Sequence, residues 1–329
     1  MDTFESFRAE LYDHNDLAFE NIALTLFRFQ ASSNTIYKAY IDNLGVSVNQ
    51  ITSVNEIPFM PISFFKNHTI KTGTWNDAAI FTSSGTTGST TSIHHIQDLD
   101  FYLNHAEQCF IKAFGELSDY HFLALLPSYL ERSNSSLVAM LQHFIKKSAS
   151  PYSGFYLHDK EKLLRDINTL KTDSRKTILW GVTFALLDLA EHEQPDLSNC
   201  LIFETGGMKG RRKEITRQEL HKTLRNGLNA NKIYSEYGMT ELLSQAYSDG
   251  SERFYCNPWI RIIGREITDP FHKGILDQTS AINVVDLANV HSIAFIETED
   301  LGKVYEDGSF EILGRMDNSD VRGCNLMVG

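Results

Sequence analysis

The sequence predicts an α/β protein in which mostly parallel strands are flanked by helices and followed by a β-rich part. Between residues 78 and 235, short apolar runs alternate with longer runs whose apolar side chains recur at helical spacing. Such alternation is typical of a parallel sheet covered by crossover helices. After residue 250, short segments of alternating polarity separated by Gly and Asp turns predict antiparallel strands.

The N-terminal segment is predicted to form a helical layer. Residues 1 to about 50 carry apolar side chains at helical spacing, beginning with Phe4, Phe7 and Leu11. Residues 57–65 contain two prolines among bulky apolar side chains, and this combination favours extended backbone over helix.

The alternating region supplies the predicted parallel sheet. Its expected strands are 78–82, 122–126, 177–180, 201–203 and 233–235, and its expected helices are 98–114, 135–147, 183–193 and 216–228. Ligands of such sheets bind at the carboxyl ends of the strands. We expect residues 1–256 to form the α/β core and residues 257–329 to form a β-rich continuation of it.

Composition excludes several classes of partner. The formal net charge of -12 disfavours nonspecific binding to nucleic acid or to an anionic membrane, since both need a basic surface. No stretch approaches the about 18 apolar residues of a membrane span, and the acidic N-terminus does not resemble a signal peptide. The four cysteines are far apart and form no CxxC pair, so a cytoplasmic location is expected. The oligomeric state is not predicted.

A loop rich in Ser, Thr and Gly follows the first predicted strand. It contains Ser83, Ser84, Gly85, Thr86, Thr87 and Gly88. The glycines permit a tight turn, while hydroxyls and backbone amides supply donors to phosphate oxygens. The loop is not a Walker loop, because no lysine follows its second glycine. Taken alone, it could equally be an ordinary surface loop.

This loop resembles the phosphate loop of the adenylate-forming enzymes, which include acyl-CoA ligases, firefly-type luciferases and peptide-synthetase adenylation domains. A second segment, Tyr237-Gly238-Met239-Thr240-Glu241, resembles another motif of that superfamily. The resemblance implies that Thr240 contacts the α-phosphate of ATP and that Glu241 holds Mg²⁺. A carboxylate suits this role, because Mg²⁺ prefers carboxylate and phosphate oxygens. The structural alternative is that Thr240 and Glu241 only cap a helix.

Three further segments match the superfamily, two after the Tyr237–Glu241 motif and one before it. Asp300, in the segment TEDLG, has the position of the aspartate that binds ribose, and Arg315, in GRMD, has the position of an arginine that contacts the nucleotide. Gly206 and Gly207 follow a predicted strand where the superfamily lays adenine against backbone. A plain turn from strand to helix explains these two glycines almost as well.

The chain's last residues resemble the end of the LuxE-type acyl-protein synthetases. Larger adenylate-forming enzymes continue into a small C-terminal lid domain with a catalytic lysine, and the resemblance implies that this lid is absent here, as in the LuxE type. In that branch a cysteine near the C-terminus receives the acyl group, and its counterpart is Cys324. The alternative is that Cys324 is a small buried side chain.

The resemblance implies a ligase that uses ATP and Mg²⁺ to convert a carboxylic acid, expected to be a fatty acid, into acyl-AMP. The acyl group would then pass to Cys324 and on to a protein partner such as a reductase or a carrier. Two other functions remain open: an acyl-CoA or aryl-CoA ligase similar to phenylacetate-CoA ligase, and a non-catalytic nucleotide-binding module. His94 and His95 follow the loop and either reach a phosphate or lie on the surface.

Overall fold

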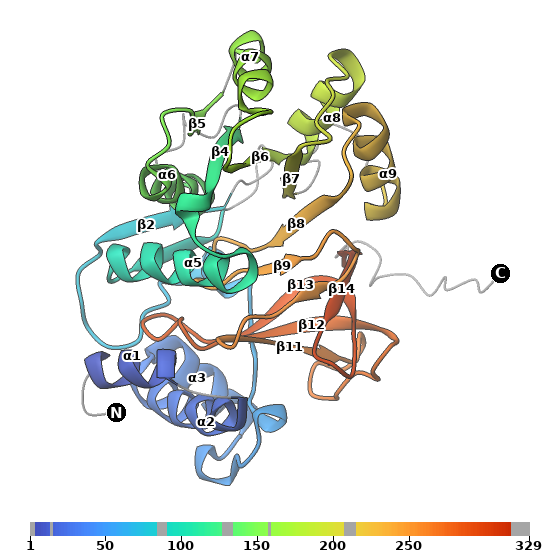
Figure 1. Cartoon of the computed structure of the whole chain (residues 1–329). Helices are drawn as coiled ribbons and strands as arrows, with labels where there is room; N and C mark the ends of the chain where they lie inside the picture. The colour runs from blue at the N-terminus through green and yellow to red at the C-terminus, as the bar shows by residue number, and fades with distance from the viewer. Residues whose placement is uncertain are drawn as a thin grey trace, which may run out of the picture.

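The computed structural model describes residues 4–13, 16–83, 91–126, 134–156, 159–206 and 215–316 (Figure 1). Seven predicted site residues lie outside these ranges: Ser84, Gly85, Thr86, Thr87, Gly88, Gly207 and Cys324. In the part of the chain that is described, no helix combines the length and the apolar character that crossing a membrane requires.

The first layer is helical, as predicted. It consists of α1 (Phe4–Asp13), α2 (Asp16–Ser33) and α3 (Thr35–Leu44), followed by the 3-10 turns η1 (Val48–Gln50) and η2 (Val54–Glu56). Asn34 caps α3 by accepting a hydrogen bond from the backbone N–H of Tyr37, and Gly45 ends it in the left-handed conformation that glycine tolerates. The proline-containing segment forms the short strand β1 (Met60–Pro61) and the single turn α4 (Phe64–Asn67).

The remaining elements follow in chain order. The first half holds β2 (Ala79–Thr82), β3 (Ile93–Ile96), α5 (Leu99–Phe114), η3 (Leu117–Asp119), β4 (Tyr120–Leu125), α6 (Ser136–Ser148), β5 (Gly154–Phe155) and α7 (Lys160–Leu170). Next come β6 (Lys176–Val182), α8 (Thr183–His192), β7 (Cys200–Thr205), α9 (Arg217–Leu228) and β8 (Ile233–Tyr237). The last are β9 (Ala246–Ser248), β10 (Phe254–Tyr255), β11 (Ile260–Arg265), β12 (Thr279–Asp286), β13 (Phe295–Val304) and β14 (Phe310–Arg315).

One large sheet carries the predicted α/β organisation. Among the described residues it has 12 strands in the order β11-β12-β13-β14-β10-β9-β8-β7-β6-β4-β5, with β1 paired to β13. The run from β5 through β4, β6 and β7 to β8 is parallel. From β8 to β11 neighbouring strands pair in antiparallel fashion. The predicted change from parallel to antiparallel strands is thereby confirmed, and it occurs within one continuous sheet.

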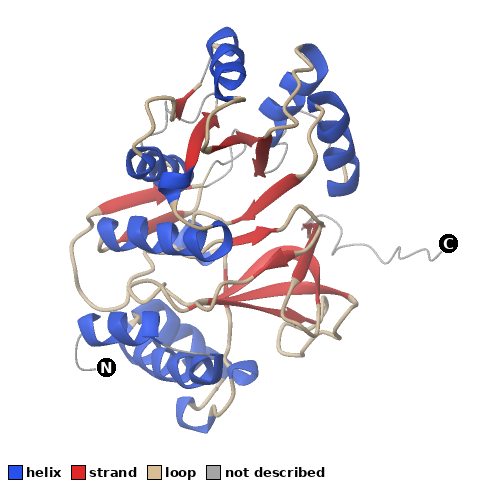
Figure 2. Ribbon diagram, in the orientation of Figure 1, coloured by secondary structure: helices blue, strands red, loops and turns tan. Residues whose placement is uncertain are grey.

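Helices cover both faces of the parallel part (Figure 2). On one face the rings of Trp180 and Phe203 stack with centroids 4.6 Å apart, and Phe110 of α5 packs against both. On the other face α8 lies so close that a Cβ on Gly181 would come within 2.7 Å of Leu186. Since neighbouring residues of a strand point to opposite faces, Trp180 and Gly181 define the two layers.

One expectation from the sequence is corrected, and one helix was missed. Residues 78–82 do form a strand, but β2 pairs antiparallel with β3 in a separate two-stranded sheet instead of joining the parallel sheet. The cause is that the Ser/Thr/Gly loop returns the chain directly into β3, where a parallel neighbour would need a helical crossover. The helix α7 was not predicted, although Leu163, Ile167 and Leu170 give it a buried stripe.

A buried histidine network joins α1, α5 and the segment after β8. His105 lies 2.8 Å from the Ser244 hydroxyl through Nε2 and 2.9 Å from the Tyr12 hydroxyl through Nδ1. Ser244 in turn donates to Asp286 over 2.6 Å, so Nε2 of His105 carries the proton and donates to Ser244 Oγ. Burial lowers the pKa of His105 from 6.5 to about 3.

We expect this neutral histidine to make the fold sensitive to mild acid. Because the pKa of His105 is lower in the folded chain than in the unfolded chain, the unfolded chain binds more protons as the pH falls from 6.5 toward 3. The stability that neutral His105 contributes is therefore lost over that pH range. At pH 5.5 the loss amounts to about 1 kcal/mol. Urea unfolding of wild type and His105→Gln at pH 5.5 and 7.5 checks this: the variant should lose less stability on acidification, and equal losses would contradict the assignment.

Candidate active site

The carboxyl ends of β7 and β8 bring two predicted motifs to the same edge of the sheet. The two strands are parallel, and Thr205 is in register with Glu236. The chain therefore leaves β7 at Gly206 beside the point where it leaves β8 at Tyr237 and Gly238. In a parallel sheet this is the edge at which ligands bind.

Three predicted residues meet through hydrogen bonds. The hydroxyl of Tyr237 donates to Asp300 Oδ2 over 2.9 Å, and Nε of Arg315 donates to Asp300 Oδ1 over 3.2 Å. The second contact follows from sheet register, because Asp300 on β13 pairs directly with Arg315 on β14. Asp300 is 5% exposed, whereas the side chain of Arg315 is 67% exposed and faces solvent at the rim.

Electrostatics keep the phenol of Tyr237 protonated. Burial, together with the neighbouring Asp300 carboxylate, holds the pKa of Tyr237 well above its usual value, so the phenol stays protonated and remains a donor. A carboxylate offers about four acceptor positions. Tyr237 and Arg315 use two of those on Asp300, and the others suit the hydroxyls of a sugar.

Glu241 is a buried carboxylate next to Ser92, which follows the loop predicted to bind phosphate. It is 5% exposed, and burial raises the pKa of its carboxyl group, while a hydrogen bond from Ser92 and the charges of Arg315 and Lys66 act in the opposite direction. Ser92 is bound to Ser83 in two ways: its N–H donates to Ser83 Oγ over 2.9 Å, and its carbonyl accepts from the Ser83 N–H over 3.1 Å. Both ends of the loop between Ser83 and Ser92 thus lie next to Glu241.

Backbone conformation and close packing require glycine at positions 206 and 238. Gly206 has φ of 76°, in the left-handed region, and its carbonyl accepts a hydrogen bond from the Thr183 hydroxyl. A Cβ on Gly238 would come within 2.4 Å of Glu236 Oε1. Gly206 is thus required by its backbone conformation, and Gly238 by the side chain of Glu236 packed against it.

A polar cluster that was not predicted from the sequence is centred on Glu204, two residues before Gly206 on β7. The carboxylate of Glu204 accepts hydrogen bonds from Ser235 Oγ over 2.6 Å and from Arg217 Nη1 over 3.1 Å. These contacts hold the pKa of Glu204 below its usual range although the side chain is buried. The cluster ties the end of β7 to the first turn of α9.

His94 is not on the surface, which corrects one of the two expectations for it. Its side chain is 1% exposed, and Nδ1 lies 2.8 Å from the carbonyl oxygen of Thr240. His95 contacts Asp77 Oδ2 over 3.1 Å on the opposite side of the β2–β3 ribbon. Burial lowers the pKa of His94 to about 4, so its imidazole is neutral.

The donor set around Glu241 fits a magnesium ion held jointly with a nucleotide. In the described ranges no group of three or more His, Cys, Asp or Glu side chains could hold a metal. Mg²⁺ is ordinarily bound by one or two carboxylates plus substrate phosphates and water, without a protein cage. A single buried carboxylate beside a loop predicted to bind phosphate matches that arrangement.

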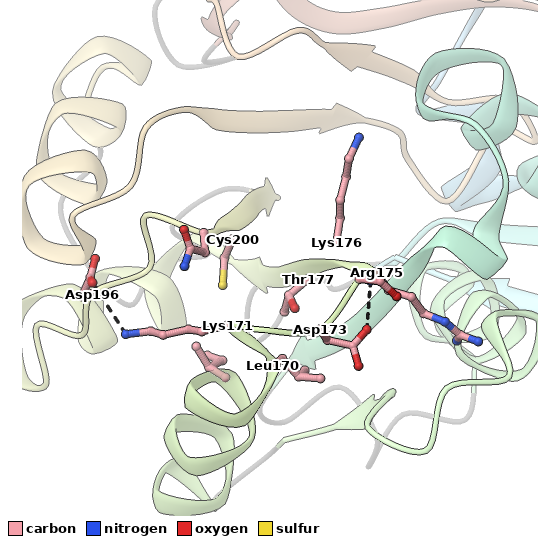
Figure 3. Close-up of a pocket in the computed structure, with 11 residues that line it drawn as sticks. Leu170, Lys171, Asp173, Arg175, Lys176, Thr177, Asp196 and Cys200 are labelled. Atoms are coloured by element: carbon pink, nitrogen blue, oxygen red, sulfur yellow. Dashed lines mark hydrogen bonds and ion pairs between the residues drawn. The ribbon is translucent and has the colours of Figure 1, made fainter.

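A cavity of about 200 Å³ lies at the opposite edge of the sheet, at the amino ends of β6 and β7 (Figure 3). Among its charged groups, Lys171 lies 3.6 Å from Asp196, while the guanidinium of Arg175 donates to the carbonyl of Ser148 outside the cavity. Cys200 lines the cavity, and burial raises the pKa of its thiol to about 11, which makes it a poor nucleophile. None of the predicted site residues contributes to it, so we do not assign the nucleotide there.

Comparison with known proteins identifies the fold. No protein-family model and no curated protein matches the sequence. Among solved structures, 2-hydroxyisobutyryl-CoA ligase, in an open conformation with 2-HIB-AMP and CoA, matches with a TM-score of 0.70 and 13% identity over 92% of this chain and 70% of the ligase. MatB from Rhodopseudomonas palustris with ATP bound matches with a TM-score of 0.54 and 19% identity over 75% of this chain.

The matches cover only part of each solved ligase. This chain spans about half the length of MatB and 70% of the 2-hydroxyisobutyryl-CoA ligase. Identities of 13% and 19% establish the architecture, a large sheet flanked by helices with antiparallel strands following the parallel ones. The chain therefore has the fold of the large N-terminal domain of adenylate-forming enzymes.

Proposed function

We propose that the protein uses ATP to activate a carboxylic acid as acyl-AMP and then transfers the acyl group to the thiol of Cys324. The observation that carries the first step is the joining of Tyr237, Asp300 and Arg315 at the edge where Glu241 meets both ends of the phosphate loop. Segments far apart in the chain would thereby supply a sugar-binding carboxylate, a cation and a metal ligand to one nucleotide.

In the first step the substrate carboxylate attacks the α-phosphorus of ATP. A bond forms between a carboxylate oxygen and that phosphorus, and the bond from phosphorus to the bridging oxygen of the β-phosphate breaks, releasing pyrophosphate. The donors of residues 83–88 and Thr240 would orient the phosphates, while Asp300 and Arg315 fix the ribose end. Glu241 would hold Mg²⁺, which neutralises the charge that develops on pyrophosphate.

In the second step the thiolate of Cys324 attacks the acyl carbonyl carbon. A thioester forms, and AMP leaves with the electrons of the broken C–O bond. Thiolates are good nucleophiles toward such mixed anhydrides. The support for Cys324 is its resemblance to the acyl-accepting cysteine of LuxE-type synthetases. The acyl group, expected to be fatty, would then pass to a reductase or carrier protein.

The competing acceptor is coenzyme A. The likeness to 2-hydroxyisobutyryl-CoA ligase, which was solved with both an acyl-AMP and CoA, supports an acyl-CoA ligase equally well. In that case CoA, and not Cys324, would consume the adenylate. A nucleotide-binding module without catalysis predicts binding of ATP but no exchange of pyrophosphate into it.

The acceptor can be decided by intact mass. Wild-type protein incubated with MgATP and a panel of fatty acids should gain the mass of one acyl group, removable by hydroxylamine, whereas Cys324→Ser should gain none and keep full acid-dependent pyrophosphate exchange. Cys256→Ser is the matched control, since this half-buried thiol, whose pKa burial raises to about 12, should leave the adduct unchanged. An adduct that persists in Cys324→Ser, or turnover that requires CoA, would refute the protein-cysteine acceptor.

A further inference from the structure

Two consecutive carbonyl groups of the Tyr237–Glu241 motif are each held by a buried side chain. Nδ1 of His94 lies 2.8 Å from the Thr240 oxygen, and Nδ2 of Asn289 donates to the Glu241 oxygen over 2.7 Å. Both side chains are 1% exposed. A carbonyl oxygen can only accept, so Nδ1 of His94 carries the proton and acts as the donor.

The two side chains are linked to each other. The hydroxyl of Ser292 lies 2.9 Å from His94 Nε2 and also contacts Asn289 Oδ1, and its one proton serves these two acceptors in turn. Ser292 is 1% exposed, so water does not replace these contacts. We term the unit formed by His94, Ser292 and Asn289 the carbonyl clamp. It is hydrogen-bonded to the backbone carbonyls of Thr240 and Glu241, the two residues proposed to contact phosphate and metal.

The N-terminal helices brace the carbonyl clamp from behind. In Figure 1 these helices lie below the antiparallel strands. Gln30 of α2 donates to the carbonyls of Asn289 and Val290 over 2.9 and 3.0 Å, and Asn34 donates to the carbonyl of Ser292 over 3.0 Å. Both side chains are 0% exposed. The brace joins residues more than 250 positions apart, because the pairs Gln30–Asn289 and Asn34–Ser292 are separated by 259 and 258 residues.

We propose that His94 and Asn289 are positioning residues for nucleotide and metal binding, because their hydrogen bonds to the Thr240 and Glu241 carbonyls set the direction of the two side chains. The inference rests on the proposed function. Groups behind a metal ligand orient it, and their loss typically lowers metal affinity by about 10- to 100-fold. A purely structural network would instead affect stability and leave the metal dependence of binding unchanged.

The test measures how much Mg²⁺ is needed for ATP to bind, by calorimetry at fixed protein concentration. In His94→Leu the Mg²⁺ concentration for half-maximal ATP binding should rise at least about 10-fold. His94→Asn should restore most of the wild-type value, since its Nδ2–H can take the place of Nδ1–H. The matched control is His121→Leu, because His121 is also buried and bonded to a serine, Ser150, over 2.6 Å, but lies at the amino end of β4.

Each outcome decides the inference. If His94→Leu and His121→Leu lose similar thermal stability while both keep the wild-type Mg²⁺ dependence, the positioning role is refuted and the proposed function stands. If His94→Leu does not fold, Asn289→Ala carries the same prediction and the same refutation. If the wild-type protein binds no MgATP, the proposed function fails and the inference fails with it.

Discussion

Glu241→Gln is expected to lower acid-dependent pyrophosphate exchange by about 100- to 1000-fold. Glutamine has the size of glutamate and can still accept the hydrogen bond from Ser92, so the loop base should keep its shape. What it lacks is the negative charge proposed to hold a divalent cation beside the phosphates.

The measurement is isotope exchange between pyrophosphate and ATP across a range of Mg²⁺ concentrations. Glu297→Gln is the matched control: burial also raises the pKa of Glu297, but this carboxylate lies 3.4 Å from Arg265 and outside the proposed site. The control should exchange at the wild-type rate. Equal exchange by Glu241→Gln and wild type, with the same Mg²⁺ dependence, would remove Glu241 from the metal site.

Asp300→Ala is expected to weaken ATP binding by about 100-fold. Its carboxylate is proposed to accept two ribose hydroxyls, and a hydrogen bond to a charged group contributes about 1.5–3 kcal/mol. The substitution also leaves the buried hydroxyl of Tyr237 without its acceptor, so a fall in stability of about 1–3 kcal/mol should accompany it.

Tyr237→Phe separates these two effects. It removes the donor to Asp300 but keeps the carboxylate and its contact with Arg315. Equilibrium dialysis should show a much smaller loss of ATP affinity for Tyr237→Phe than for Asp300→Ala, although both variants disturb the same hydrogen bond. If the two variants lose affinity equally, or neither does, then Asp300 does not contact the nucleotide.

The fold was predictable where residue periodicity and burial agree. Residues 98–114 and 216–228 form helices within one residue of the predicted limits, because Asp98 and Thr216 accept backbone hydrogen bonds as N-caps. The sheet membership of residues 79–82 was not predictable in the same way. Their apolar pattern specifies a strand, but which strand pairs with it depends on where the following chain returns.

The candidate site was predictable as a set of motifs but not as an arrangement. Local sequence picks out Tyr237, Asp300 and Arg315, yet the contact between the last two arises from the register of β13 and β14. The contacts of His94 and Asn289 carry no local signal, because their partners at Thr240 and Glu241 are 146 and 48 residues away and are backbone oxygens. A hydrogen bond of this kind leaves no pattern of residue types to detect.

A crystal structure of the protein with ATP and Mg²⁺ tests the central claim most directly. The account predicts that both ribose hydroxyls lie within about 3.2 Å of the Asp300 carboxylate and that a metal ion between the phosphates contacts Glu241. Nucleotide bound in the cavity at the amino ends of β6 and β7, or anywhere out of contact with Asp300 and Glu241, would contradict it.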